Sequence, residues 1–177
     1  GTTQIGIVIF LNDYYLQSYT IYEKELFMKT IIDYITCFQN DDLKLLTLNF
    51  KLGSGVAPLS IYLIKEIYDT FKTRKSLKVY LINESNSSKI RIQDKNRGIK
   101  TKHEASALIL AMRKGFEVNQ ENYYEIIKQK KFLKIKNFER DESFLEDFKE
   151  RERKVKEIID RLINDDISLS NASIILE

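Results

Sequence analysis

The first part of the chain reads as a β-hairpin. Residues 4–11 form a continuous apolar run, which is typical of a buried strand. Asn12 and Asp13 follow, and these two residue types suit a tight turn. Residues 14–22 then alternate as a partnered strand would. The pattern therefore predicts two strands that pair through the turn.

Helices and strands are predicted to alternate after the hairpin. Apolar residues recur at helical spacing in three segments, residues 23–38, 59–72 and 104–114. Between these helices lie two apolar runs of strand type, residues 43–52 and 77–82. The order is thus β-β-α-β-α-β-α, and strands that follow crossover helices pair in parallel. We expect an α/β fold with a mixed sheet that has helices on both faces.

The composition changes after Gly115, which divides the chain into a domain at 1–115 and a helical C-terminal extension at 116–177. Residues 142–164 form a charged helix whose apolar positions drift between three- and four-residue steps. Such a pattern suits packing on another surface, so we expect this helix to contact a second copy of the chain or a protein partner. The polar residues 170–173 are expected to end it.

Composition describes a globular protein with a substantial core. Hydrophobic residues make up 43% and charged residues 31% of the chain. No apolar run approaches the roughly 20 residues of a membrane span, and no signal-peptide pattern is present, so we expect a cytoplasmic protein without membrane contact. The single cysteine, Cys37, lies in an apolar helical stretch and is expected to be buried.

The net charge of +3 hides a segregation of charge along the chain. Residues 89–136 contain 13 Lys and Arg against 5 Asp and Glu, whereas residues 139–177 contain 7 against 12. A basic segment in the middle of a chain favours a polyanionic partner, because phosphate contacts supply most non-specific affinity for nucleic acids. The alternative is a set of scattered, solvated surface lysines.

Residues that can support metal and phosphate chemistry gather between 84 and 104. Glu84 follows the predicted strand at 77–82, and His103 and Glu104 open the next predicted helix, whose small residues allow it to lie close to a sheet. The loop between them is basic. Its cations are Lys89, Arg91, Lys95, Arg97, Lys100 and Lys102. A metal-and-phosphate site is one interpretation, and an ordinary βα crossover with a solvated loop is the other.

Three stretches resemble the RuvC/YqgF branch of the RNase H-like nuclease superfamily. The opening Gly-Thr-Thr-Gln-Ile-Gly resembles the end of that family's Asp-x-Gly-Thr-Thr-x-x-Gly first-strand motif, whose metal-binding aspartate would lie before Gly1 and is not in the sequence. Residues 81–88 resemble the YqgF Val-Asp-Glu-Arg element, with Glu84 on its glutamate. Residues 102–110 resemble the last helix, where His103 falls on an aspartate position that some RuvC enzymes fill with histidine and Ser106 falls on another aspartate position.

The resemblance implies an RNase H-like sheet and a metal-dependent nuclease of Holliday-junction-resolvase or YqgF type. Glu84 and His103 would then be catalytic and, with Glu104 as a further ligand, would hold Mg²⁺ or Mn²⁺, since hard oxygen-rich sites suit these ions. Two such metals hydrolyse a phosphodiester by activating water and stabilising the leaving oxygen. The loop cations would bind the backbone of structured DNA or RNA.

Two other classes of function are compatible with the sequence. One is a catalytically inactive RNase H-like module that binds nucleic acid or a protein partner, because Ser106 is a poor replacement for a carboxylate. The other is an ATPase of the actin and sugar-kinase type, which also begins with Asp-x-Gly-Thr. That fold normally duplicates its domain, and 177 residues are too few for two copies.

Overall fold

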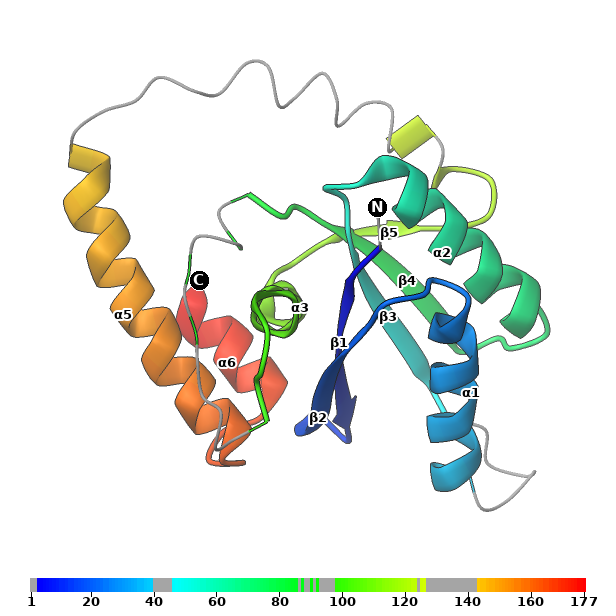
Figure 1. The fold of residues 1–177 in the computed structure, drawn as a ribbon, viewed down its shortest axis with the longest axis horizontal. Coiled ribbons are helices and arrows are strands. Elements are labelled where there is room, and N and C mark those ends of the chain that lie inside the picture. The colour runs from blue at the N-terminus through cyan, green and yellow to red at the C-terminus, as the bar shows by residue number, and fades with distance from the viewer. Residues whose placement is uncertain are drawn as a thin grey trace.

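A computed structural model of the chain describes residues 3–39, 46–85, 87, 90, 92, 98–123, 125–126 and 143–177. The strands are β1 (Ile5–Leu11), β2 (Tyr14–Ile21), β3 (Leu48–Gly53), β4 (Leu77–Ile82) and β5 (Phe116–Val118). The helices are α1 (Leu26–Phe38), α2 (Ala57–Phe71), α3 (Lys102–Met112), α5 (Ser143–Ile163) and α6 (Leu169–Leu176). The elements follow one another in the predicted order as far as α3 (Figure 1).

The predicted hairpin is confirmed. β1 and β2 pair antiparallel, and Leu11 faces Tyr14 across the turn. Asn12 and Asp13 form that turn with φ angles of 51° and 72°. Both angles lie in the left-handed region, which Asn and Asp tolerate better than most residues, and two such residues in succession match the twist of the flanking strands.

A second sheet contains β3, β4 and β5. β3 and β4 are parallel, with Gly53 beside Ile82, as their helical crossover predicts. β5 is antiparallel to β4 and makes the sheet mixed. The sequence analysis missed β5 because a three-residue strand carries too little periodicity to detect.

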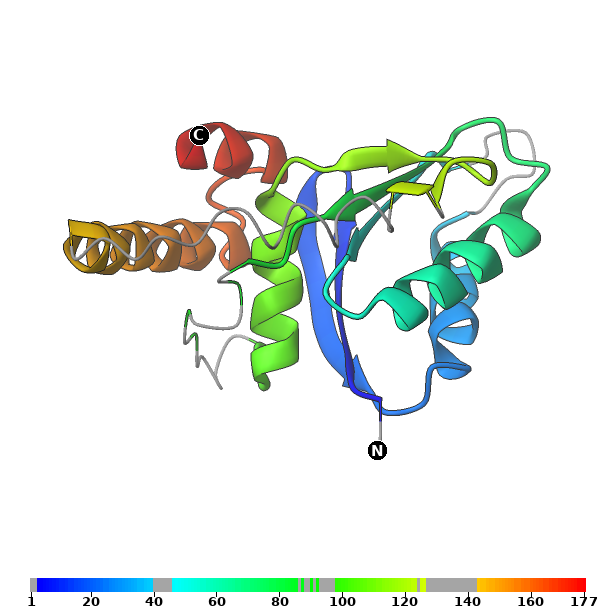
Figure 2. The same ribbon diagram turned by 90° about the horizontal axis from the view of Figure 1, so that it is seen from above.

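Helices cover the strands from two sides (Figures 1 and 2). Along β1, Ile5 and Ile7 belong to a core shared with α1 and α2, whereas Val8 and Phe10 pack against a second core built on α3. This division follows from the alternation of side chains along a strand. The predicted α/β architecture with helices on both faces is therefore confirmed.

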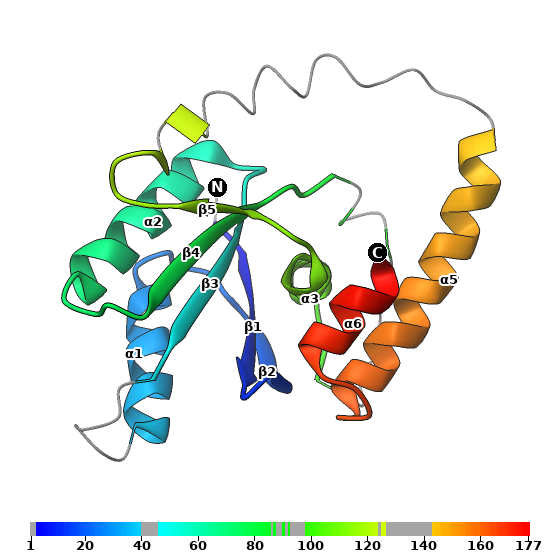
Figure 3. The ribbon, with the colours of Figure 1, turned by 180° about the vertical axis from the view of Figure 1, so that it is seen from behind.

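The C-terminal helices α5 and α6 pack on the outer side of α3 (Figure 3). Ile159 and Leu162 of α5 and Ala172 of α6 are fully buried there with Leu108 of α3. Of the apolar residues that suggested a partner-binding helix, those between 155 and 163 thus pack within this chain. The strand β5 adds to the sheet and the helix α5 adds to the core. The sheet and the core therefore both include residues beyond the boundary predicted at residue 115.

The prediction that residues 170–173 end the long helix was wrong. The chain turns at Asp165, whose φ is 60°, and residues 170–173 lie inside α6. Ser168 is the N-cap of α6 and accepts a hydrogen bond from the Asn171 amide at 3.3 Å. Small polar residues favour helix starts as well as helix ends, and here they begin a helix.

Cys37 is exposed, in contrast to the expected burial. The buried face of α1 carries Phe27 and Met28, with Ile31 and Ile35 packed beside them. Cys37 lies outside that stripe of residues, and an apolar stretch of sequence does not by itself identify the buried side of a helix. No helix in the described ranges combines the length and the apolar composition that a membrane crossing requires.

A very close backbone contact joins β1 to the beginning of α3. A Cβ atom added to Gly6 would overlap the backbone carbonyl of His103 and approach the amide of Glu104. Only a residue without a side chain lets the helix backbone lie this close to the strand. The small residues of α3 were expected to allow such an approach, and the glycine in β1 completes it.

We expect Gly6→Ala to lower the free energy of unfolding by about 1–3 kcal/mol, because the methyl group meets backbone that can move only with the whole helix. Urea denaturation measures this change. Thr73→Ala, at an exposed position, is the control and should change stability by less than about 0.5 kcal/mol. Equal stability of the Gly6→Ala protein and the parent would contradict the close packing of α3 on β1.

Candidate functional site at the carboxyl ends of β3 and β4

Glu84 lies where the parallel strands β3 and β4 both end. Gly53 and Ile82 are register partners at that edge, and Glu84 follows two residues later. The turn after β3 contains Gly53 and Gly55, and a Cβ atom on either glycine would overlap the Glu84 carboxylate. The carboxylate is therefore seated directly against this glycine turn. Ligands of open α/β sheets bind outside the carboxyl ends of such strands.

Hydrogen bonds within the loop hold Glu84 in place. The Asn83 side-chain oxygen accepts from the Ser85 amide at 2.9 Å and from the Ser85 hydroxyl at 2.6 Å. The Ser87 hydroxyl donates to the Glu84 carbonyl oxygen at 2.9 Å. Asn and Ser commonly replace backbone bonds in this way just after a strand. The polar residues that predicted a strand exit thus shape the loop itself.

Arg113 approaches the same loop from the end of α3. Its Nη1 donates to the Asn83 carbonyl oxygen at 2.7 Å. Partial burial lowers the pKa of Arg113, and the negative charge of Glu84 acts in the opposite direction. Arg113 therefore places a cation near the carboxylate and ties the loop to the helix.

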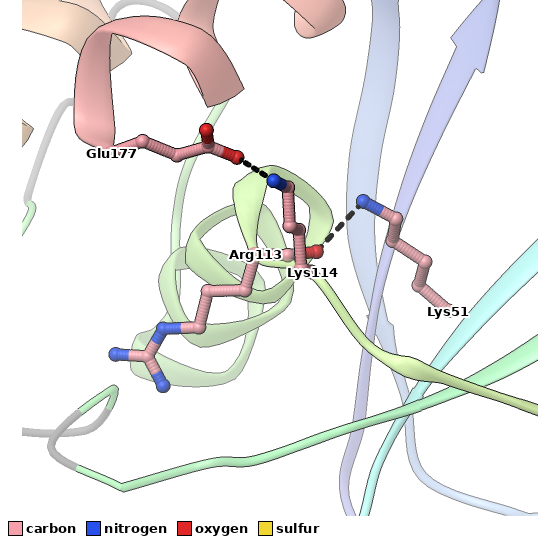
Figure 4. A network of polar contacts seen from close by, with 4 residues as sticks. All are labelled: Lys51, Arg113, Lys114 and Glu177. Atoms are coloured by element: carbon pink, nitrogen blue, oxygen red, sulfur yellow. Dashed lines mark hydrogen bonds and ion pairs between the residues drawn. The ribbon is translucent and has the colours of Figure 1, made fainter.

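Lys51 stabilises the same end of α3. Its Nζ donates to the carbonyl oxygen of Ala111 at 2.5 Å. It also donates to the carbonyl oxygen of Arg113 at 2.9 Å (Figure 4). These carbonyls have no partner within the helix, and a cation is favourable beside them. Partial removal from water lowers the pKa of Lys51. Lys114 forms an ion pair with Glu177, so the end of α6 reaches this region too (Figure 4).

Glu104, at the other end of α3, is a structural carboxylate in this fold. It is only 2% exposed. One oxygen accepts from the Lys100 amide at 2.7 Å and the other from the Thr20 hydroxyl at 3.1 Å. Its own amide donates to the hydroxyl of the N-cap residue Thr101 at 3.2 Å. This resembles a capping box, except that the Glu104 carboxylate accepts from the amide before the N-cap, and through Thr20 it joins β2 to the helix.

His103 and Glu84 lie toward opposite ends of α3. The backbone of His103 packs on Gly6 at the first turn, whereas the loop of Glu84 is bonded to Arg113 just after the last turn. Ten residues separate 103 from 113, which corresponds to a rise of about 15 Å along the helix. No contact within the described part of the chain joins Glu84 to His103.

The described residues do not gather the three predicted ligands of a Mg²⁺ or Mn²⁺ centre. Among them, no cluster of three or more His, Cys, Asp or Glu side chains is arranged to hold a metal ion. One oxygen of Glu104 accepts from the Lys100 amide and the other from the Thr20 hydroxyl, and Glu84 lies beside the cationic Arg113. The predicted ligand set of Glu84, His103 and Glu104 is therefore not brought together at one point.

The predicted nucleic-acid-binding cations fall into two groups. Lys89, Arg91, Lys95 and Arg97 lie outside the described residues. Lys100 and Lys102 are exposed and flank Thr101 at the beginning of α3. They add positive charge beside the positive end of the helix dipole.

Sequence reasoning missed the roles of Lys51 and Arg113 at the far end of α3. The end of the helix was predicted beside Arg113, but its approach to the Glu84 loop and the approach of Lys51 from β3 depend on the fold. Sequence reasoning also missed the role of Glu104, although the signal was present. Thr101 and Glu104 are spaced as Thr-x-x-Glu ahead of an apolar run, which is the signature of a capping box.

Comparisons of this chain with protein-family models, with curated proteins and with solved structures find no match. The RNase H-like resemblance thus rests on the residues quoted above, and a function is proposed on the site alone.

We expect Glu104→Gln to lower the free energy of unfolding by about 1–3 kcal/mol in the presence of EDTA, because it weakens the charge-assisted hydrogen bonds of a buried carboxylate. Thermal and urea unfolding measure the loss. Glu121→Gln, at an exposed position, serves as the control. If Glu104 were instead a metal ligand, the variant and the parent would have equal free energies of unfolding in EDTA. Their stabilities would differ only when Mg²⁺ is added.

Proposed function

We propose that this protein is a nucleic-acid-binding module with an RNase H-like topology that binds its target without cleaving it. The topology is supported by the β1–β2 hairpin followed by the α-β-α-β-α order of the next elements. The parallel pairing of β3 with β4 and the position of α3 on the opposite face from α1 and α2 are compatible with it.

The observation that carries the binding proposal is the pair of exposed lysines at the beginning of α3. Lys100 and Lys102 lie beside the positive end of the helix dipole, and four more cations precede them within 12 residues of sequence, from 89 to 100. Phosphate groups are favoured where several cations and a helix start converge. The partner with the matching chemistry is the phosphate backbone of DNA or RNA.

The positions and hydrogen bonds of the carboxylates favour binding over cleavage. Two-metal hydrolysis requires several carboxylates or imidazoles at one point. In the described residues, Glu104 is used by the capping box and Glu84 lies toward the other end of α3 from His103. The metal-dependent nuclease remains the second candidate, because Glu84 lies at the carboxyl ends of the strands.

We expect the double variant Lys100→Gln, Lys102→Gln to bind labelled duplex DNA more weakly, with the slope of log Kobs against log salt becoming less steep by about 1.8, because each lost phosphate contact contributes about 0.9. Fluorescence anisotropy across a salt series measures this slope. The matched control is Lys75→Gln, Lys78→Gln, which removes the same charge at exposed positions near the start of β4. An equal change in the two variants would contradict a site at α3.

We expect branched DNA and single-stranded RNA to stay intact when incubated with the protein in Mg²⁺ or Mn²⁺, because the described carboxylates and imidazole do not meet. Gel electrophoresis of end-labelled substrates tests this. Cleavage that is abolished by Glu84→Gln and kept by Glu121→Gln would contradict a binding-only role and establish the nuclease.

A further inference from the structure

β2 is the outer strand of its sheet. It pairs with β1 on one side, and no strand pairs with its other side in the described part of the chain. Apart from the ladder to β1, no backbone–backbone hydrogen bond between described residues involves positions 14–22. A strand edge of this kind presents N–H and C=O groups with which a further strand can pair.

The edge of β2 lacks the features that usually prevent pairing with another chain. Natural edge strands are commonly short, or they carry charged residues or proline. β5, the outer strand of the other sheet, follows this rule, because it has three residues and one of them is Glu117. β2 has eight residues, and none is charged or proline, although 31% of the chain is charged. The neutrality of β2 therefore indicates an edge that a partner strand covers.

A bulge shortens the regular part of β2 without removing it. The ladder with β1 skips Leu16, which is an extra residue near the hairpin turn. From Gln17 to Ile21 the pairing with β1 is continuous. Residues 17–21 can thus pair with a further strand along the outer edge.

Exposed aromatic and aliphatic side chains border this edge. Three large side chains on β2 or directly after it are at least 39% exposed, namely Tyr14, Leu16 and Tyr22. On α1, the ring of Phe38 is also exposed and stacks on Tyr34, which stacks in turn on Tyr19 of β2. Grouped apolar side chains on a surface mark contacts with other proteins. The edge thus combines a backbone that has no second ladder with apolar surface, as a protein interface does.

We propose that β2 pairs antiparallel with β2 of a second copy of this chain, about a two-fold axis through Tyr19. In an antiparallel pair, facing side chains lie on the same side of the sheet. A centre at Tyr19 satisfies this condition, because Ser18 of one copy then faces Thr20 of the other. Gln17 faces Ile21 in the same way. None of these residues is charged, so no like charges meet.

A second copy fits this edge better than an unrelated strand. It brings a strand of equal length and equal neutrality, and one closed pair covers both edges at once. The exposed side chains beside β2 are repeated on both sides of the axis, so each copy offers apolar surface to the other. The inference does not depend on nucleic-acid binding.

The mass of residues 1–177 in solution tests the partner. We expect sedimentation velocity over a concentration series to show a dimer of the 20.9 kDa chain. Leu16→Lys adds a charge to the edge and should raise the dissociation constant of the dimer by about tenfold or more. Val56→Lys, at an exposed position after β3, is the matched control and should leave this constant unchanged.

Circular dichroism of both variants separates loss of the dimer from loss of the fold. A monomer at every concentration of the parent protein would assign the edge to another partner or to water, and would overturn the proposal. An equal effect of Leu16→Lys and Val56→Lys would overturn it too.

Disulfide cross-linking tests the register, in a protein whose exposed Cys37 is replaced by Ser. Tyr19→Cys places one thiol of each copy at the axis, where facing Cα atoms are about 4.5–5.5 Å apart, a distance that a disulfide spans. Gln17→Cys is the control, because its two copies would lie about 13 Å apart along the strands. We expect only Tyr19→Cys to give a cross-linked dimer on a non-reducing gel. Equal cross-linking of the two variants, or cross-linking of Gln17→Cys alone, would overturn the proposal.

Discussion

The fold depends on the contact between the backbone of α3 and the backbone of β1 at Gly6. This contact sets the distance of the helix from the strands, and everything on that face is built on α3. The helix is anchored at its beginning by Glu104, which reaches both its own cap and Thr20 of β2. At its end, Lys51 of β3 donates to the final carbonyls. One helix is thus bonded to both sheets, although the sheets are not bonded to each other.

The same geometry decides what the candidate site can do. A helix of 11 residues places its first and last turns far apart, and the predicted acidic and imidazole groups are distributed between these ends. Positive charge is present at both ends, from Lys100 and Lys102 at the first and from Arg113 and Lys51 at the last. Cations at two separated points of one helix are compatible with the proposed contact with an extended polyanion.

The elements whose sequence signals are local were predictable. The hairpin at Asn12 and Asp13, the parallel strands at 48–53 and 77–82, and the helix at 102–112 follow from alternation, turn residues and periodicity. Three features could not be predicted, because they depend on the residues that pack nearby in the fold. These are the exposure of Cys37, the strand β5 and the helical conformation of residues 170–173. For the candidate site, the position of Glu84 at a strand end was predictable, whereas its separation from His103 depends on which end of α3 the loop reaches.

The hairpin turn also links the two ends of the chain. The carbonyl and the carboxylate of Asp13 accept hydrogen bonds from the amides of Leu169 at 2.7 Å and Ser170 at 3.0 Å, so a turn made early in the sequence caps the last helix. During synthesis on the ribosome, Asp13 emerges long before its partners, and the apolar outer side of α3 stays uncovered until residues 155–172 follow. Contacts between such distant parts of a chain form late and slowly, because a long loop must close first. Completion of this side of the fold therefore requires the last part of the chain.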